Sequence, residues 1–257
     1  MTFSTLRSAA GEPLGLVIAC EDLSTIRRME ARMRQADRLA SLGRMSANIA
    51  HEIRNPLASM TGAIEALTAK SGISPDDRDR LTQIVLRESD RLNNIIGDFL
   101  AYARPRPLSL ERADVAGVLE DVLTLVEHRP LPPNVKIVRT FESPLTAHVD
   151  PDALRQAVWN LCLNALDAMP DGGELTVRAS VIASMLHLSV GDTGRGIASG
   201  DVSHIFEPFF STKPEGSGLG LALVHRIVRD HAGDIEVRTD SEFGTTFTLM
   251  LPLGVHD

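Results

Sequence analysis

Apolar residues recur at steps of three and four along the first part of the chain, the spacing of a helix with one buried side. Ser24 is a suitable N-cap residue, so the pattern predicts one long helix from Ser24 to about Lys70. Charged residues fill the positions between the apolar ones in its first half, as in a coiled coil. A helix of this length does not fit inside a compact domain, so the apolar stripe predicts self-association. The stripe comprises Ile26, Met29, Met33, Ala36, Leu39, Leu42, Met45, Ile49, Ile53, Leu57, Met60, Ile64 and Leu67.

A second amphipathic helix is predicted shortly after the first. Gly72 ends the first helix, and the segment Ser74–Asp77 supplies a cap, a proline for the first turn and two acids at the positive end of the helix dipole. The second helix then runs to about Arg104. Two antiparallel helices joined by a short loop form a hairpin, and two hairpins form a four-helix bundle, so we predict a homodimer. The apolar positions of the second helix are Leu81, Val85, Leu92, Ile95, Ile96, Phe99 and Tyr102.

The pattern changes on both sides of this hairpin. Thr2–Arg7 and Leu14–Cys20 are predicted to be short strands, which cannot bury a core of their own. The Arg-Pro-Arg-Pro run at residues 104–107 is a linker that cannot continue a helix. One antiparallel-leaning sheet covered by helices is an α/β sandwich, so we predict an α+β chain with domains at 1–23, 24–104 and 109–257. In the last domain we expect helices at 114–128, 150–169 and 218–231, and strands at 135–141, 174–182, 185–191, 235–239 and 245–251.

Composition narrows the possible functions. The 257 residues carry a net charge of −8 and no basic run, which argues against nucleic-acid binding. Cys20 and Cys162 are the only cysteines, and they lack the spacing of a metal site. The chain has no signal peptide and no apolar run of about eighteen residues, so we expect no membrane span in it. We expect a cytoplasmic location, either alone or as the cytoplasmic part of a membrane-anchored sensor.

His51 stands out on the first predicted helix because it lies two residues from an apolar neighbour on either side. At about 100° per residue, its side chain points roughly 200° away from the apolar stripe, into solvent. Asn55 lies one turn further on the same face, whereas Glu52 reaches the imidazole only sideways. Pro56 lacks an N–H and should bend the helix at a cost of about 3 kcal/mol. A lone surface histidine is usually only solvated, but these neighbours favour a chemical role.

Two segments of the last domain are suited to holding a base and a metal ion. Asn160 and Asn164 lie one turn apart on one helix face, and amide oxygens suit Mg²⁺. Asp192 ends a strand and is followed by Gly194 and Gly196, so its carboxylate can accept a hydrogen bond from an exocyclic amine where backbone approaches closely. Taken singly, each segment is ordinary, because paired asparagines are usually solvated and such glycines often form a plain turn.

Two further segments are suited to covering and binding phosphate. The run Ile-Phe-Glu-Pro-Phe-Phe at 205–210 is followed by Lys213, and its phenylalanines are either core residues or anchors of a movable lid. Gly216, Gly218 and Gly220 open an amphipathic helix, where glycines expose N–H donors to an anion. This turn is neither a dinucleotide fingerprint nor a Walker loop, because no strand immediately precedes it and the Gly-Lys-Ser/Thr ending is absent.

Together and in this order, the segments resemble those of sensor histidine kinases of two-component systems, over residues 24–253. The family's H box is matched by SLGRMSANIAHEIRNPL, its N box by NLCLNALDAM, its G1 box by DTGRGI, its F box by IFEPFFSTK and its G2 box by GSGLGLALV. Residues 1–23 resemble the last strand hairpin of a PAS sensor domain whose remainder is missing. The resemblance implies a dimerisation and phosphotransfer domain followed by an ATP-binding domain of the GHKL (Bergerat) type.

The resemblance also implies an activity and a set of site residues. The enzyme would transfer the γ-phosphoryl group of Mg-ATP to His51, then to an aspartate of a response regulator, and would dephosphorylate that regulator. Glu52 would take the second imidazole proton, and Asn55 would orient water. Asn164 would bind Mg²⁺. The residues assigned to ATP are Asn160, Asn164, Asp192, Gly194, Gly196, Lys213, Gly216, Gly218, Leu219, Gly220 and Thr245.

One departure from the family pattern and two rival interpretations stay open. The family often has a basic residue about one turn past its second asparagine, where this chain has Asp167, so Lys213 or His225 would have to supply the cation. A non-kinase ATPase of the class shared by type II topoisomerases, the MutL proteins and the Hsp90 chaperones would form no phosphohistidine. Asn160 counts against it, because those ATPases carry a glutamate there. The other rival is a dimeric scaffold or phosphatase without kinase activity, against which the intact glycines and asparagines count.

Overall fold

A computed structural model gives the coordinates. In the unit Met1–Ala50, β1 (Thr2–Arg7) and β2 (Pro13–Ala19) pair antiparallel, which confirms the predicted strand pair with its second member starting one residue early. The PAS interpretation of this pair stays a prediction, and the predicted helix over 24–48 lies outside the described residues. The second unit is His51–Asp257. The structure describes residues 2–7, 11, 13–19, 49–69, 73–103, 106–142, 144–213, 216–240 and 243–254.

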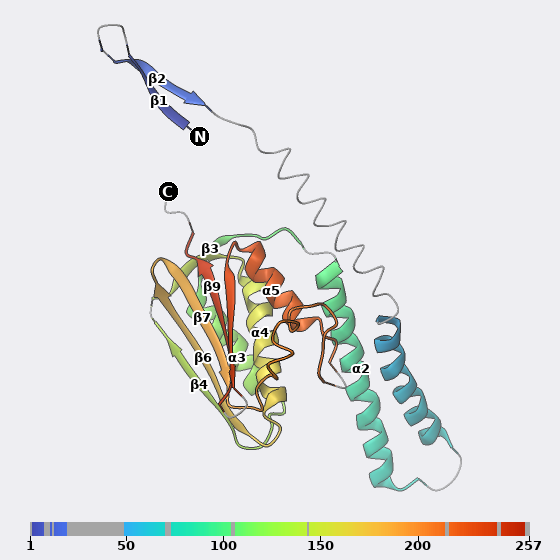
Figure 1. The fold of residues 1–257 in the computed structure, drawn as a ribbon. Coiled ribbons are helices and arrows are strands. Elements are labelled where there is room, and N and C mark those ends of the chain that lie inside the picture. The colour runs from blue at the N-terminus through green and yellow to red at the C-terminus, as the bar shows by residue number, and fades with distance from the viewer. Residues whose placement is uncertain are drawn as a thin grey trace. The chain divides into compact units, whose positions relative to one another are not determined.

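The second unit begins with the helical hairpin that the apolar stripe predicts (Figure 1). Its first helix is described over residues 49–68 and runs through Pro56 without interruption. Its second helix is α2 (Pro75–Ala103). The Ser74 hydroxyl accepts a hydrogen bond from the Asp77 N–H at 3.0 Å and donates one to the Asp77 carboxylate at 2.8 Å, which confirms the predicted helix start. The bend at Pro56 stays a prediction, and the stop at Gly72 lies outside the described residues.

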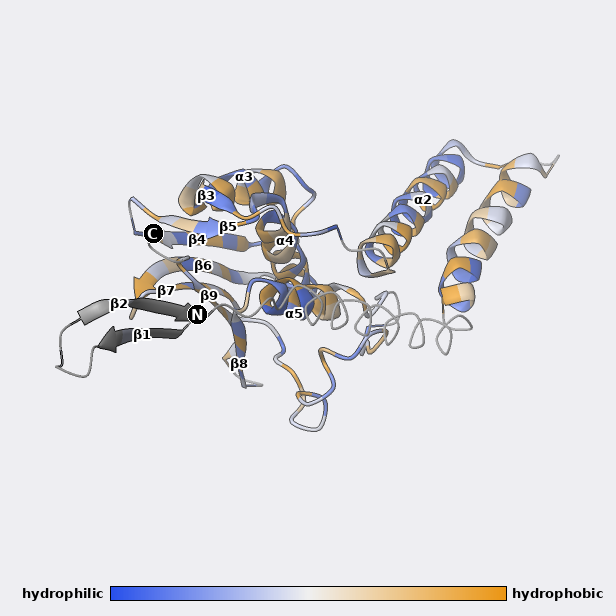
Figure 2. Ribbon diagram, turned by 90° about the horizontal axis from the view of Figure 1, so that it is seen from above, coloured by the Kyte–Doolittle hydropathy of each residue, from blue (hydrophilic) through white to orange (hydrophobic). Residues whose placement is uncertain are grey.

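Packing between the two hairpin helices covers only part of their apolar residues. Ala63 and Ile95 are buried. Figure 2 shows apolar residues interspersed with polar ones along both helices. Burying an apolar side chain contributes about 1.5–3 kcal/mol, so the uncovered residues favour contact with a second hairpin. The residues that remain 40–62% exposed in the single chain are Leu57, Ile64, Leu86, Ile96 and Leu100.

The rest of the second unit is a five-stranded sheet that shares one core with three helices (Figure 1). The first two strands of this sheet, β4 (Val135–Phe141) and β6 (Gly173–Ile182), are parallel, and the other neighbouring strands are antiparallel. The predicted sandwich is therefore confirmed, with one parallel pair. The helices are α3 (Val115–Glu127), α4 (Pro151–Ala168) and α5 (Gly220–Asp230), the last starting two residues later than predicted. The strand order is β4 (Val135–Phe141), β6 (Gly173–Ile182), β7 (Met185–Asp192), β9 (Gly244–Pro252) and β8 (Asp234–Asp240).

Alternate residues of the central strands point into this core, because side chains of a strand alternate between its faces. The inward residues of β6, β7 and β9 join the inner faces of α3, α4 and α5 in one hydrophobic cluster. The polar residue Asp192 ends β7 at the edge of this cluster. The inward residues are Leu175, Val177, Ala179, Leu186, Leu188, Val190, Phe247, Leu249 and Leu251.

One strand pair is not predicted by the sequence pattern. β3 (Glu111–Asp114) and β5 (Thr146–Val149) form a separate two-stranded antiparallel sheet. Each strand has four residues, too few for alternation to be recognised. Their buried residues Ala113, Ala147 and Val149 complete the core beside α3. Among the helices that the structure describes, none has a stretch long and apolar enough to cross a bilayer.

Asp150 ties the start of α4 to the segment that leads out of the hairpin. Its Oδ1 accepts hydrogen bonds from Asp152 N at 3.1 Å and Ala153 N at 3.0 Å, as predicted for a cap. Its Oδ2 accepts one from Ser109 N at 2.9 Å, and Arg106 contacts Oδ1 at 2.8 Å. Burial acts to raise the pKa of Asp150, but these N–H donors and the Arg106 guanidinium outweigh it and lower the pKa below its ordinary value of 3.8.

Replacing Asp150 by alanine is expected to lower the free energy of unfolding by about 2 kcal/mol, because the helix cap is removed and the N–H groups that donate to this buried carboxylate lose their acceptor. Asp150→Asn should cost less, since asparagine also caps a helix. The folded-state pKa lies below the unfolded one, so the stability due to the charge is present above about pH 4 and lost as the pH falls through the folded-state value. Urea unfolding of wild type and Asp150→Asn at neutral and acidic pH measures this. A gap between the two proteins that stays constant would contradict the role given to the charge.

Candidate functional site

His51 lies on the outer side of the first hairpin helix. Its side chain is exposed, and so is that of Asn55 one turn further along, as predicted. Glu52 differs, because it is half-buried and its Oε2 is buried with no hydrogen-bond partner among the described residues. Burial raises the pKa of Glu52, and the Arg91 guanidinium of α2 acts in the opposite direction. Glu52 therefore lies against α2, beside the exposed His51 and not in solvent with it.

Asn160 projects from α4 toward the start of α5. It is only 9% exposed, and its Nδ2 has no hydrogen-bond partner within the described part of the chain. A Cβ placed on Gly220 would meet the Asn160 carboxamide at 3.8–3.9 Å. A buried amide group without a partner is uncommon in folded proteins. Asn160 is therefore not the solvated surface residue that a lone asparagine on a helix usually is, and its donor is available to a ligand.

Asn164 lies one turn further along α4 and already contacts a cation. The Lys213 ammonium donates to the Asn164 Oδ1 at 2.9 Å and to the Asp167 Oδ2 at 2.8 Å. The contact brings the segment that carries Lys213 onto the face of α4 that carries the asparagines. The acidic side chain that departs from the family pattern is thus paired with the lysine predicted to replace the missing cation.

Asp192 ends β7 and is held by one backbone N–H from the loop that follows it and one from the start of β9. Its Oδ1 accepts hydrogen bonds from Gly194 N at 2.8 Å and Thr245 N at 3.3 Å. Asp192 is 8% exposed and Thr245 is 4% exposed. Burial raises the pKa of Asp192, while the two N–H donors and the Lys213 ammonium act to lower it. The carboxylate is therefore fixed in direction while its second oxygen accepts none of the hydrogen bonds recorded in the described part of the chain.

Glycines around Asp192 let three backbone segments meet. A Cβ on Gly194 would lie 2.5 Å from the Ala168 carbonyl oxygen at the end of α4. A Cβ on Gly244, which has φ +86°, would lie 2.0 Å from the Asp192 carbonyl oxygen. Gly196 has φ +66°, a conformation that side chains disfavour. Gly244 is not among the predicted site residues, because its role shows only when β9 lies beside β7.

The segment between β7 and α5 closes on the glycine-rich turn. The Phe209 N–H donates to the Gly218 carbonyl at 2.9 Å, and both residues have positive φ, +66° and +62°. A Cβ on Gly218 would lie 2.4 Å from the Phe209 carbonyl carbon. Phe206 packs its ring against His225 and Phe247, with centroids 5.2 Å and 6.4 Å apart. Phe206 therefore anchors the segment to the core, and the Phe209 backbone meets the glycine-rich turn.

Gly216 and Leu219 determine the path of the backbone through this turn. A Cβ on Gly216 would lie 2.5 Å from the Ser211 Oγ, so this glycine also permits a close approach. Leu219 is fully buried, so its side chain belongs to the core and only its backbone faces the turn. Its N–H donates to the Ser217 Oγ at 3.3 Å. Among the predicted ATP residues, Leu219 can therefore contribute only its backbone to the turn.

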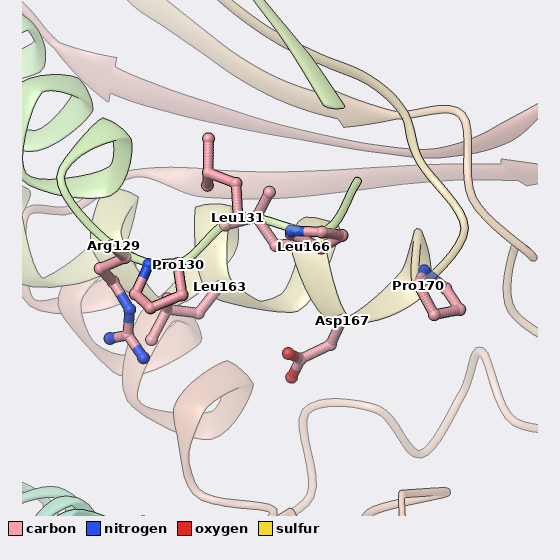
Figure 3. Close-up of a pocket in the computed structure, with 8 residues that line it drawn as sticks. Arg129, Pro130, Leu131, Leu163, Leu166, Asp167 and Pro170 are labelled. Carbon is pink, nitrogen blue, oxygen red and sulfur yellow. The ribbon is translucent and has the colours of Figure 1, made fainter. Parts of the chain in front are cut away.

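A pocket of about 400 Å³ borders this region on another side of α4 (Figure 3). Asp167 lies at its rim, and it includes none of the residues predicted to bind ATP. The Arg129 guanidinium at the opposite rim lies over the Trp159 ring, 5.4 Å from its centroid. The pocket and the asparagine face of α4 are therefore neighbours that share the Asp167 helix turn. Its lining residues are Arg129, Pro130, Leu131, Pro132, Leu163, Leu166, Asp167 and Pro170.

Two protein families match this chain, one over the hairpin and one over the domain that follows it. The family described as His Kinase A (phospho-acceptor) domain matches residues 41–107, and that described as Histidine kinase-, DNA gyrase B-, and HSP90-like ATPase matches residues 149–255. The sensor histidine kinase ZraS of Escherichia coli (strain K12) is 36% identical over 228 residues, which cover 88% of this chain and 49% of ZraS. The chain belongs to the sensor histidine kinases of two-component systems. The histidine-protein kinase AtoS of the same organism is 34% identical over 255 residues, covering 98% of this chain and 42% of AtoS.

Two solved structures share the fold of this chain. Histidine kinase ThkA in complex with the response regulator protein TrrA aligns with a TM-score of 0.74 at 27% identity, over 98% of this chain and 74% of ThkA. Full-length ShkA in complex with AMPPNP aligns with a TM-score of 0.59 at 29% identity, over 82% of this chain and 46% of ShkA. This histidine kinase chain spans about half the length of the curated relatives it matches. In the family's terms, α4 carries the N box and Gly218 belongs to the G2 box.

Proposed function

We propose that the chain is an ATP-dependent protein-histidine kinase that phosphorylates its own His51 and passes the phosphoryl group to an aspartate of a response regulator. The observation that carries the proposal is the exposure of His51 on the hairpin. By helix geometry it lies roughly 120–140° round the helix from the uncovered Leu57 and Ile64. An imidazole so placed stays accessible when a second hairpin covers those apolar residues, as expected for the proposed homodimer.

The polar groups of the ATP-binding domain fit a magnesium-bound nucleotide. Asn164 would hold Mg²⁺, and the contact of its Oδ1 with the Lys213 ammonium supports this, because that oxygen already faces a cation. The metal, when bound, neutralises phosphate charge. The unpaired buried Nδ2 of Asn160 would donate to the nucleotide, and the second carboxylate oxygen of Asp192 would accept from the adenine amine. When the nucleotide binds, the Lys213 ammonium would leave the Asn164 amide oxygen and donate to a phosphate oxygen instead.

The chemistry at His51 needs little from the protein besides position. One imidazole nitrogen attacks the γ-phosphorus, the N–P bond forms, and the bond from phosphorus to the bridging oxygen breaks so that ADP leaves with the electron pair. The other nitrogen then loses its proton, and Glu52 is the acceptor beside it. A neutral imidazole has a free lone pair on one ring nitrogen, so orientation provides most of the acceleration.

The partner proposed for the phosphorylated hairpin is the receiver domain of a response regulator. The structure of ThkA holds such a regulator, TrrA, and this supports the same class of partner here. Asn55 shares the exposed face of His51 and would orient water for dephosphorylating the regulator. Its amide has both donor and acceptor groups, which is what positioning a water molecule requires.

Replacing His51 by alanine is expected to abolish transfer of label from [γ-³²P]ATP to the protein, because the only proposed nucleophile is removed. In wild type the label should be acid-labile and alkali-stable, as a phosphohistidine is. Binding of an ATP analogue should not change in the variant. His128→Ala is a control, since His128 is another exposed histidine, and it should leave labelling intact.

Two outcomes would contradict the proposed function. Label that persists in His51→Ala would show that another residue accepts the phosphoryl group. Hydrolysis of ATP without any labelled wild-type protein would favour the non-kinase ATPase, which differs from the kinase in forming no phosphohistidine.

A further inference from the structure

A cluster of charged side chains lies inside the hairpin, beside the His51 helix turn. Glu88 of α2 is only 4% exposed, although glutamate is rarely buried. Its carboxylate faces two arginines, with Arg91 Nη1 at 3.6 Å and Arg87 Nη2 at 3.5 Å. The two arginines differ in environment, because the Arg91 side chain is 20% exposed and the Arg87 side chain is 68% exposed. Arg91 therefore belongs to the helix–helix interface, and Arg87 lies at the surface.

Arg91 and Glu52 each keep a buried polar atom unpaired. The Arg91 Nε and the Glu52 Oε2 have no hydrogen-bond partner in the part of the chain that the structure describes. Buried polar atoms are normally paired, so two such atoms of opposite charge need a physical reason. The two side chains interact electrostatically across the interface, since Arg91 favours the ionised form of Glu52. Glu88 holds the other side of the same guanidinium.

We propose that Arg91 is a positioning residue for Glu52: placed between Glu52 and the buried Glu88, it holds the Glu52 carboxylate beside His51, with Oε2 buried and the other oxygen left to accept the imidazole proton. The inference rests on the proposed function of His51. In the reaction, one imidazole nitrogen gains the phosphoryl group and the proton on the other passes to Glu52. A Glu52 in a full bidentate pair with arginine would be a poorer acceptor, because both oxygens would be occupied.

The charges around Glu52 determine in which direction its pKa changes when Arg91 is replaced. Among the described residues, Arg91 faces Glu52 from α2 with Glu88 behind it, and His51 and Arg54 neighbour it on its own helix. Burial raises the pKa of Glu52 and Arg91 opposes this rise. Without the guanidinium, a larger fraction of Glu52 would be protonated on the acid side of neutrality and unable to act as a base.

The test is the pH profile of His51 phosphorylation in the full chain. Arg91→Met should raise the ratio of the rate at pH 8 to that at pH 6 about threefold or more over wild type, whereas Arg91→Lys should stay close to wild type because the charge is kept. In a Glu52→Gln background, Arg91→Met should cause no further change in the profile, since the group it acts on is gone. Arg87→Met removes the exposed partner of Glu88 and should leave the profile unmoved.

Stability is separated from positioning by a second variant. Arg91→Met alone leaves Glu88 buried without a partner, which can unfold the hairpin. The double variant Glu88→Gln, Arg91→Gln removes both charges and should show the same change of profile with an intact thermal transition. If the pH profiles of the folded variants without the Arg91 charge, Arg91→Met and the double variant, superimpose on the wild-type profile, the inference is overturned and the proposed function stands. A wild-type chain that acquires no label at His51 would overturn the proposed function itself.

Discussion

Replacing Gly218 by alanine is expected to weaken the binding of a fluorescent ATP analogue about tenfold or more and to lower His51 labelling in parallel. Gly218 has φ +62°, which costs an L-residue about 1–2 kcal/mol, and about 1.4 kcal/mol is already tenfold in affinity. The added Cβ would lie 2.4 Å from the Phe209 carbonyl carbon, a backbone atom that cannot rotate away. The turn must therefore separate from the F-box segment and lose the hydrogen bond between Phe209 N–H and Gly218 O.

Gly200→Ala is the matched control for this substitution. Gly200 lies in the same connection between β7 and α5, and a Cβ there meets nothing within 4 Å. The control should bind the analogue as wild type does. Equilibrium titration of both variants, with a thermal melt of each, separates local distortion from unfolding. A Gly218→Ala protein that binds like wild type would show that the shape of this turn does not determine nucleotide affinity.

Features that depend on one helix or one strand could be predicted from the sequence. The exposure of His51 followed from its angle to the apolar stripe, because helix geometry is the same in every context. The cap at Asp150 followed from the Asp-Pro pair, since both residues have strong positional preferences at a helix start. The shared face of Asn160 and Asn164 followed from their spacing of four. Each of these needs only residues within two helical turns.

Features that depend on contacts between distant segments could not be predicted. Lys213 and Asn164 are 49 positions apart in sequence, and nothing in either segment specifies that the ammonium lies on the amide oxygen. Gly244 was not predicted to have a role in the site, and the reason it must lack a side chain is the Asp192 backbone across the sheet. Glu52 was expected to reach sideways toward the imidazole. Its burial against Arg91 depends on the packing register of the hairpin helices, which the period of the apolar stripe does not determine.

The second prediction with a large expected effect concerns the interface of the proposed four-helix bundle. Replacing Ile64 by aspartate is expected to weaken self-association of the chain by about a hundredfold or more. Ile64 is 48% exposed in the single chain, so about half of its burial energy of roughly 1.5–3 kcal/mol awaits a partner, and the carboxylate adds a desolvation cost. In a twofold-symmetric interface each substitution occurs twice, so the losses double to about 3 kcal/mol, which is about a hundredfold in dissociation constant.

Ala66→Asp is the matched control, because Ala66 is exposed on the same helix and lies about 200° round it from Ile64. Sedimentation equilibrium over a range of concentrations should give a dimer for wild type and for Ala66→Asp, and a shift to monomer for Ile64→Asp. The residues predicted to bind ATP lie in the separate ATP-binding domain, so loss of the dimer should leave analogue binding unchanged. An Ile64→Asp protein that dimerises as tightly as wild type would mean that Leu57 and Ile64 do not face the partner. The exposed apolar side of the hairpin would then require another occupant, because side chains of this size rarely gather on a surface that nothing covers.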